Sequence, residues 1–120
     1  MKNIIKQYGF DFDWTEEKVW NLKYPIEKMS IKELEWHFYI PFWGNNYDIK
    51  PIDVIKYPEK YFEEYQKIMN SDLKYPIDIM KNKGRWTILD GLHRLAKCHL
   101  LNIKMVKVRK IPRTEIFNIK

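Results

Sequence analysis

The stretch from residue 75 to residue 111 changes its hydrophobic period halfway along, and this change restricts the folds open to the chain. "YPIDIM" and "RWTILD" are typical of two strands, joined by a turn in which Gly84 is available for a positive φ. After Asp90 the apolar residues repeat at helical spacing, namely Leu92, Leu95, Ala96 and Leu100. Asn102 can end that helix, and "IKMVKVRKI" then closes the unit as a strand. The pattern predicts strand, strand, helix and strand, with the helix beginning at Gly91 or Leu92.

The N-terminal half of the chain adds shorter elements. Residues 13–23 favour a short helix, and "YPIEKM" indicates a strand. "SIKELEWHF" indicates a further helix, because Ser30 and Glu33 have the spacing of a capping box. Pro51 and Pro58 each suit the first turn of a helix. We therefore expect a small α+β fold in which a mixed sheet is flanked by helices.

The length and composition of the chain fit one globular domain over residues 1–120. Hydrophobic residues make up 45% of the sequence and charged residues 32%, which supplies both a core and a polar surface. No run approaches the roughly 20 apolar residues of a membrane span, and the start lacks the pattern of a signal peptide. We expect a cytoplasmic protein with no membrane partner. Cys98, the only cysteine, is expected to be a buried structural thiol.

The net charge of +6 and the pI near 9.3 suit an anionic partner, either nucleic acid or a phosphorylated small molecule. The basic residues are spread along the chain, and the densest run, "KMVKVRKIPR", alternates with apolar residues as an exposed strand face does. The five tryptophans could stack on bases, although aromatic residues more often form the core. Nucleic acid therefore stays open as a partner.

The turn from Asp90 to Arg94 is the strongest candidate site. A helix N-terminus has unpaired N–H groups and about half a positive charge, so adding His93 and Arg94 there makes sense if an anion binds. Gly91 would let a phosphate approach the backbone, and Gly91, Leu92, His93 and Arg94 form the predicted phosphate- or nucleotide-binding group. Asp90 has two candidate roles, capping the helix or holding Mg²⁺ or a substrate hydroxyl beside the phosphate.

The motif "ILDGLHRLAKCHLLNIKMVKV", preceded by "YPIDIMKNKGRW", resembles the nucleotide-binding core of the ParB/sulfiredoxin superfamily. The resemblance covers residues 75–111, and a weaker one begins at "YPIEKMSIKEL". Leu92 stands where sulfiredoxins carry a catalytic cysteine, so sulfinic acid reduction is not expected. It also stands where chromosome-segregation ParB proteins carry a glutamate, which argues against CTP-gated DNA clamping.

The Asp-Gly-x-His-Arg form is most similar to the branch that includes free serine kinase. This resemblance implies that Asp90, Gly91, His93 and Arg94 surround a transferred phosphate, with His93 and Asp90 catalytic and Asp90 near the metal. It also implies a glutamate base from the N-terminal segment. Glu35 is our choice over Glu33 and Glu27, with the "PFWG" loop at the rim of the same cleft. His37 could equally be a core or a surface histidine.

Three functions follow as hypotheses. The first is a phosphoryl-transfer enzyme, a kinase or a nucleotide hydrolase, that uses ATP, ADP or CTP with Mg²⁺ and acts on a small hydroxyl acceptor. The second is a nucleic-acid-binding protein or a ParB-like nuclease. The third is a regulatory module that binds a nucleotide without turning it over.

Overall fold

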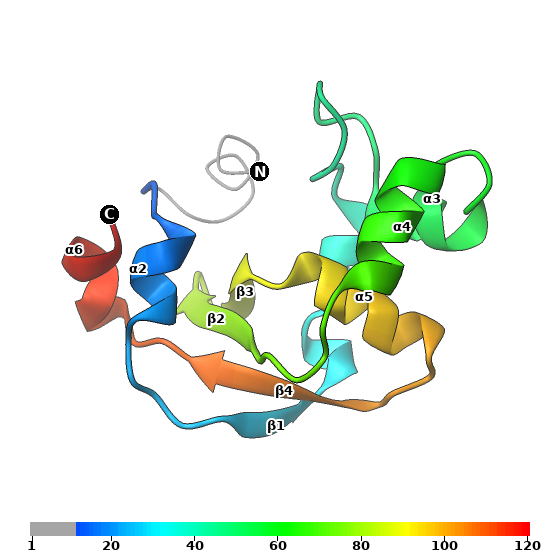
Figure 1. Cartoon of the computed structure of the whole chain (residues 1–120). Coiled ribbons are helices and arrows are strands. Elements are labelled where there is room, and N and C mark those ends of the chain that lie inside the picture. The colour runs from blue at the N-terminus through cyan, green and yellow to red at the C-terminus, as the bar shows by residue number, and fades with distance from the viewer. Residues whose placement is uncertain (1–11) are drawn as a thin grey trace.

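Four strands form one mixed sheet in the computed structural model, which describes residues 12–120 (Figure 1). The strands are β1 (Glu27–Ser30), β2 (Ile77–Asn82), β3 (Arg85–Asp90) and β4 (Met105–Lys110). Their order is β1-β4-β2-β3, with β4 parallel to β2 and the two outer pairs antiparallel. The predicted α+β fold with a mixed sheet is therefore confirmed.

The predicted strand, strand, helix, strand unit is present. A two-residue turn joins β2 to β3, and Lys83 (φ 50°) and Gly84 (φ 83°) both have positive φ there. Helix α5 (Leu92–Leu100) begins at one of the two predicted residues, and Asn102 ends it with a φ of 60°. Because β2 and β3 are antiparallel and α5 follows β3 directly, the start of α5 lies beside the first residues of β2.

The remaining helices gather at the two ends of the sheet (Figure 1). Helices α3 (Pro51–Lys56) and α4 (Phe62–Asn70) pack on α5, whereas α2 (Glu16–Trp20) packs on α6 (Ile116–Ile119) at the other end. Pro51 opens α3 as predicted. The helix predicted from Pro58 is wrong in its start, because a turn occupies residues 58–61 and α4 begins only at Phe62. No helix among residues 12–120 is long and apolar enough to cross a membrane.

The predicted helix at residues 30–38 is instead two 3-10 helices, η1 (Ile31–Glu33) and η2 (Glu35–Tyr39). Ser30 caps the first by accepting a hydrogen bond from the N–H of Lys32. The buried side chains suit this tighter winding, since Ile31, Leu34 and His37 recur every third residue. Three residues make one turn of a 3-10 helix, so this spacing places all three on the side that faces the core.

Cys98 and His37 are titratable residues that pack in the core. Cys98 is buried, and burial raises the pKa of its thiol, as expected for a structural cysteine. His37 is 1% exposed; its Nδ1 donates to the carbonyl of Leu34 at 2.7 Å, and its Nε2 accepts from the N–H of Ile88 at 3.0 Å. Accepting at Nε2 requires a neutral ring, and burial lowers the pKa of His37 from 6.5 to about 3. His37 is therefore a satisfied core histidine.

This histidine predicts a pH dependence of stability. Below pH 6.5 the unfolded chain binds a proton at His37 that the folded chain does not bind, so stability is lost as the pH falls from 6.5 toward 3. Urea unfolding between about pH 7 and pH 5 should show a loss that approaches about 1.4 kcal/mol per pH unit. His37→Gln should be less stable at neutral pH but should show a flatter profile. Identical slopes for the two proteins would contradict this role.

Candidate anion-binding site at the start of helix α5

The first turn of α5 has no side-chain cap among residues 12–120. Gly91 is the N-cap residue, with φ 116° and ψ 19°, and its carbonyl accepts the first helical hydrogen bond from Leu95. The N–H groups of residues 92–94 precede that bond and have no partner inside the helix. The capping role considered for Asp90 is therefore wrong, because the chain turns into the helix one residue later.

Asp90 instead receives two side-chain hydrogen bonds on one carboxylate oxygen. The indole N–H of Trp20 donates to Oδ2 at 2.7 Å, and the guanidinium of Arg94 donates to the same atom at 2.9 Å. The Arg94 and Asp90 side chains are 16% and 24% exposed, so the ion pair is partly shielded from water. The structure thus brings together the Asp90, Gly91 and Arg94 group that the sequence predicts.

Gly91 is required at this junction for two reasons. A Cβ on Gly91 would lie 3.2 Å from the backbone Cα of Ile77 in β2, and its φ is unfavourable for any other residue. The same Cβ would lie 3.1 Å from the Arg94 guanidinium, which folds back over the glycine. The missing side chain therefore allows both the close packing of α5 on β2 and the position of Arg94.

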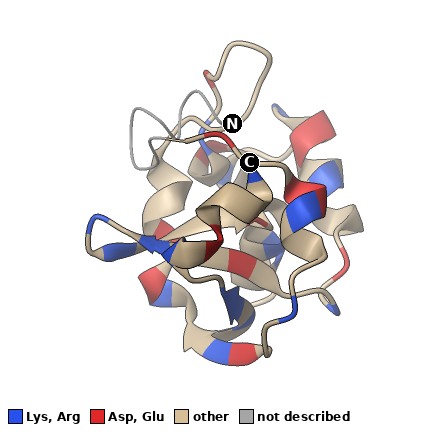
Figure 2. Cartoon of the chain, turned by 90° about the vertical axis from the view of Figure 1, so that its left-hand side faces the viewer, with Lys and Arg blue, Asp and Glu red and all other residues tan. Residues whose placement is uncertain are grey.

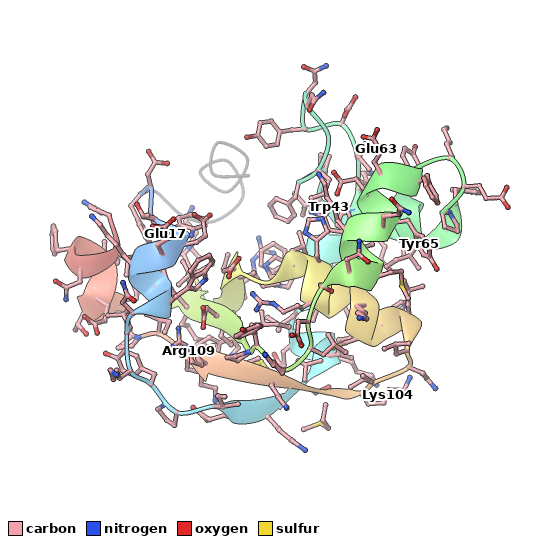
Figure 3. All side chains as sticks on the ribbon, viewed as in Figure 1. Glu17, Trp43, Glu63, Tyr65, Lys104 and Arg109 are labelled. Atoms are coloured by element: carbon pink, nitrogen blue, oxygen red, sulfur yellow. The ribbon has the colours of Figure 1, made fainter. Side chains whose placement is uncertain are left out.

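His93 makes contacts that the sequence did not reveal. Its Nε2 lies 2.9 Å from a carboxylate oxygen of Glu64 in α4, and the indole of Trp43 stacks on its ring at 4.3 Å and 10°. Figure 3 shows Trp43 between α4 and the start of α5. Trp43 thus places the "PFWG" loop beside His93, as predicted. Glu64 has no sequence signal beyond an acidic first turn of α4, which is common in helices.

Three adjoining hollows surround this turn. The central hollow, of about 370 Å³, is lined by Glu16, Trp43, Ser71, Asp72, Tyr75 and residues 90–94. The aromatic hollow, of about 770 Å³, adjoins it through Tyr75, Asp90 and Arg94. The loop hollow, also of about 770 Å³, lies between the 42–49 loop and α4 and adjoins the central hollow through Trp43 and His93. Arg94 and His93 thus stand at the two boundaries of the central hollow.

The aromatic hollow exposes large apolar side chains. Trp20, Ile26 and Tyr75 line it and are 57%, 55% and 55% exposed. Arg109 also lines this hollow, and it lies at the end of β4 nearest α2 (Figure 3). Arg109 donates to the carboxylate of Asp78 at 2.7 Å and to the carbonyl oxygens at the end of α2. Exposed apolar surface gathered in one hollow is typical of a binding surface.

The expectation that Glu35 shares a cleft with His93 is wrong. Glu35 lies 3.9 Å from Nδ1 of His99, which is six residues after His93 and therefore about 9 Å farther along α5. Glu27 pairs with Lys110, across β1 and β4. Glu33, in η1, does not line the central hollow. The segment that the resemblance marks as the source of the base thus lies away from the start of α5.

Metal ligands are few at this turn. No group of three or more histidine, cysteine or acidic side chains suited to a metal is present in residues 12–120. The central hollow is nevertheless lined by three carboxylates, those of Glu16, Asp72 and Asp90. Mg²⁺ usually takes one or two carboxylates together with the phosphates of a substrate, so these residues fit a metal that arrives with a phosphate.

Comparison with protein-family models, curated proteins and solved structures finds no match to this chain. The assignment to the ParB/sulfiredoxin superfamily therefore stays a prediction, and the site has to be judged from its own geometry.

The backbone geometry predicts unequal effects of alanine at two glycines with positive φ. Gly91→Ala should lower the free energy of unfolding by about 2 kcal/mol or more, because it adds a backbone clash to the cost of the left-handed conformation. Gly84→Ala is the matched control, since it has open space around it and should cost only about 1 kcal/mol. Urea unfolding measures both values. Equal losses would show that the contact with β2 is unimportant.

Proposed function

We propose that the chain is a ParB/sulfiredoxin-like nucleotide-binding protein that transfers a phosphoryl group to a small hydroxyl compound or to water. The observation that carries this proposal is the uncapped start of α5, with Arg94 beside it. This turn lines the central hollow together with His93, and the aromatic hollow adjoins it. The aromatic hollow would bind the nucleobase, the central hollow the phosphates, and the loop hollow the acceptor.

The phosphates would bind in the central hollow. The N–H groups of residues 92–94 supply the donors, and Arg94 can exchange its bond to Asp90 for bonds to a phosphate oxygen. Glu16, Asp72 and Asp90 line the same hollow and would repel a bare anion. This charge distribution favours a complex of the nucleotide with Mg²⁺, which would neutralise phosphate charge, with Asp90 as the carboxylate nearest the turn.

The nucleobase would bind in the aromatic hollow. Trp20 and Tyr75 offer flat, half-exposed rings, and stacking on such rings contributes about 1–3 kcal/mol per base. Tyr75 and Arg94 line this hollow and the central one, so a base and its phosphates could occupy both at once. The volumes of both hollows fall within the usual range for small-molecule sites.

Arg94→Ala tests this proposal. ATP, ADP or CTP with Mg²⁺ at about 100 times its dissociation constant should stabilise the wild-type protein by about 2.7 kcal/mol in a thermal-shift experiment. Arg94→Ala should abolish that stabilisation and leave a folded protein, whereas Arg85→Ala, in the β2-β3 hairpin, should keep it. Omitting Mg²⁺ should weaken the effect. If no nucleotide stabilises the wild-type protein, or if the Arg94→Ala protein does not fold, the proposal is wrong and Arg94 is a structural partner of Asp90.

A second candidate function is favoured by the cations around Trp36 and Trp86. The Arg85 guanidinium lies 3.5 Å from the centre of the Trp36 ring, and Lys81 and Lys110 lie 5.1 and 5.3 Å from the Trp86 ring. Figure 2 shows lysine and arginine along the hairpin that projects from the sheet. Alternating cations and aromatic rings suit single-stranded nucleic acid, in which bases stack and phosphates pair with the cations.

The nucleic-acid hypothesis predicts a different mutational response. Lys81→Ala with Arg85→Ala should weaken binding of a labelled single-stranded oligonucleotide in fluorescence anisotropy. It should also flatten the plot of log affinity against log salt by about 0.7 for each phosphate that the variant no longer neutralises. Arg94→Ala serves as the reciprocal control and should bind the oligonucleotide normally. Unchanged affinity in the double variant would remove this function from consideration.

A further inference from the structure

We infer that His93 is the general base of the proposed phosphoryl transfer and that Glu64 positions it, so that the acceptor hydroxyl enters from the loop hollow. The inference rests on the proposed function and replaces Glu35 as the base. It comes from three features of the described residues, namely the bond between His93 and Glu64, the stacking of Trp43, and the place of His93 between two hollows.

The bond to Glu64 selects the protonation pattern of the ring. A carboxylate only accepts hydrogen bonds, so a neutral His93 beside Glu64 carries its proton on Nε2, which donates at 2.9 Å. Nδ1 then holds the lone pair, and no residue among 12–120 forms a hydrogen bond with it. Glu64 is only 14% exposed, which strengthens its interaction with the ring relative to an exposed pair.

Trp43 and Glu64 together limit the motion of the imidazole. The indole covers one face of the ring at 4.3 Å, nearly parallel to it, and Trp43 is itself buried. Glu64 fixes the edge of the ring from the neighbouring helix. A base that is held in one rotamer by packing and by a hydrogen bond retains the geometry that proton transfer needs.

His93 lies next to the proposed binding sites of both reactants, the phosphate and the acceptor. His93 follows Leu92 in the first turn of α5, so its ring is adjacent to the backbone N–H groups proposed for the phosphates. The same ring lines the loop hollow, whose wall also carries Asn45, Tyr47, Lys60 and Tyr61. Polar and aromatic groups of this kind suit a small hydroxyl compound. His93 therefore lies where an acceptor in the loop hollow would meet a phosphate in the central hollow.

The charged groups around this ring differ between its two sides. Glu63, Glu64, Lys60 and Lys67 line the loop hollow, and Lys67 pairs with Glu64 at 3.4 Å. Glu16, Asp72, Asp90 and Arg94 line the central hollow. Of the carboxylates on both sides, only that of Glu64 forms a hydrogen bond with the His93 ring.

The chemical step balances with these groups. The acceptor hydroxyl gives its proton to Nδ1 of His93 while its oxygen forms a bond to the terminal phosphorus of the nucleotide. The bond from that phosphorus to the bridging oxygen breaks, and the electron pair stays on the departing nucleotide phosphate. The imidazolium formed is stabilised by the carboxylate of Glu64 and later gives its proton to water.

A matched pair on the same helix provides the controls. His99 and Glu35 form a second histidine–glutamate pair, at the opposite end of α5 and outside all three hollows. We would compare His93→Asn and Glu64→Gln with His99→Asn and Glu35→Gln. Conversion of ATP, ADP and CTP with Mg²⁺ would be followed by ³¹P NMR, with water alone and with glycerol as the acceptor, and nucleotide binding by thermal shift.

We expect His93→Asn to lower turnover by about 10² to 10⁴ and Glu64→Gln by at least about tenfold, with nucleotide stabilisation largely kept. Both control variants should turn over at the wild-type rate. Nitrogen-15 shifts of the wild-type His93 ring should place its proton on Nε2, and Glu64→Gln should disturb that placement. This spectrum needs no activity, so it tests the positioning role even if His93→Asn does not fold.

Three results would overturn the inference. The first is a wild-type ring that carries its proton on Nδ1. The second is loss of turnover in Glu35→Gln with normal turnover in Glu64→Gln, which would return the base to Glu35. The third is nucleotide binding without consumption of any nucleotide, which would reject both the base and the phosphoryl transfer and leave a nucleotide-binding module. Absence of nucleotide binding to the wild type would instead reject the proposed function itself.

Discussion

The close approach of Gly91 to β2 is the constraint on which the site depends. A side chain at this position would lie 3.2 Å from the Cα of Ile77 and would be strained at this φ, so any other residue would destabilise the start of α5. The same approach directs the first turn of α5 toward the end of β3 and lets the Arg94 guanidinium fold over the glycine to reach Asp90. One missing Cβ thus fixes the position of the N–H groups, the cation and the carboxylate relative to one another.

The sequence was most informative where the structure is local. The hairpin with Gly84, the start of α5 and its end at Asn102 were all predictable, because turn chemistry and helical periodicity depend on neighbouring residues. The 30–38 segment was predicted as one helix and is wound more tightly. Its buried positions at a spacing of three are satisfied by 3-10 turns as well as by an α-helix, so the sequence pattern alone does not distinguish the two.

The site was predictable only in part for the same reason. Asp90, Gly91, His93 and Arg94 are contiguous, so one motif finds them together. Glu64 and Trp43 reach His93 only through tertiary packing, and Trp20 reaches Asp90 across 70 residues of sequence. The choice of Glu35 follows a family pattern. In the structure η2 packs against the far end of α5, and Glu35 lies beside His99 there. Side chains that approach from other elements leave no signal in a single sequence.

The three bonds of Arg109 have a consequence for the order in which the site is completed during synthesis. Arg109 links the end of α2 to Asp78 across as many as 90 residues, and Trp20 at that end forms one wall beside Asp90. The ribosome makes Trp20, the turn at Gly91 and Arg109 at widely separated times. A nascent chain that has emerged only as far as α5 lacks Arg109, whose hydrogen bonds tie the end of α2 to Asp78 in β2. The wall beside Asp90 therefore gains this support only after β4 has been made.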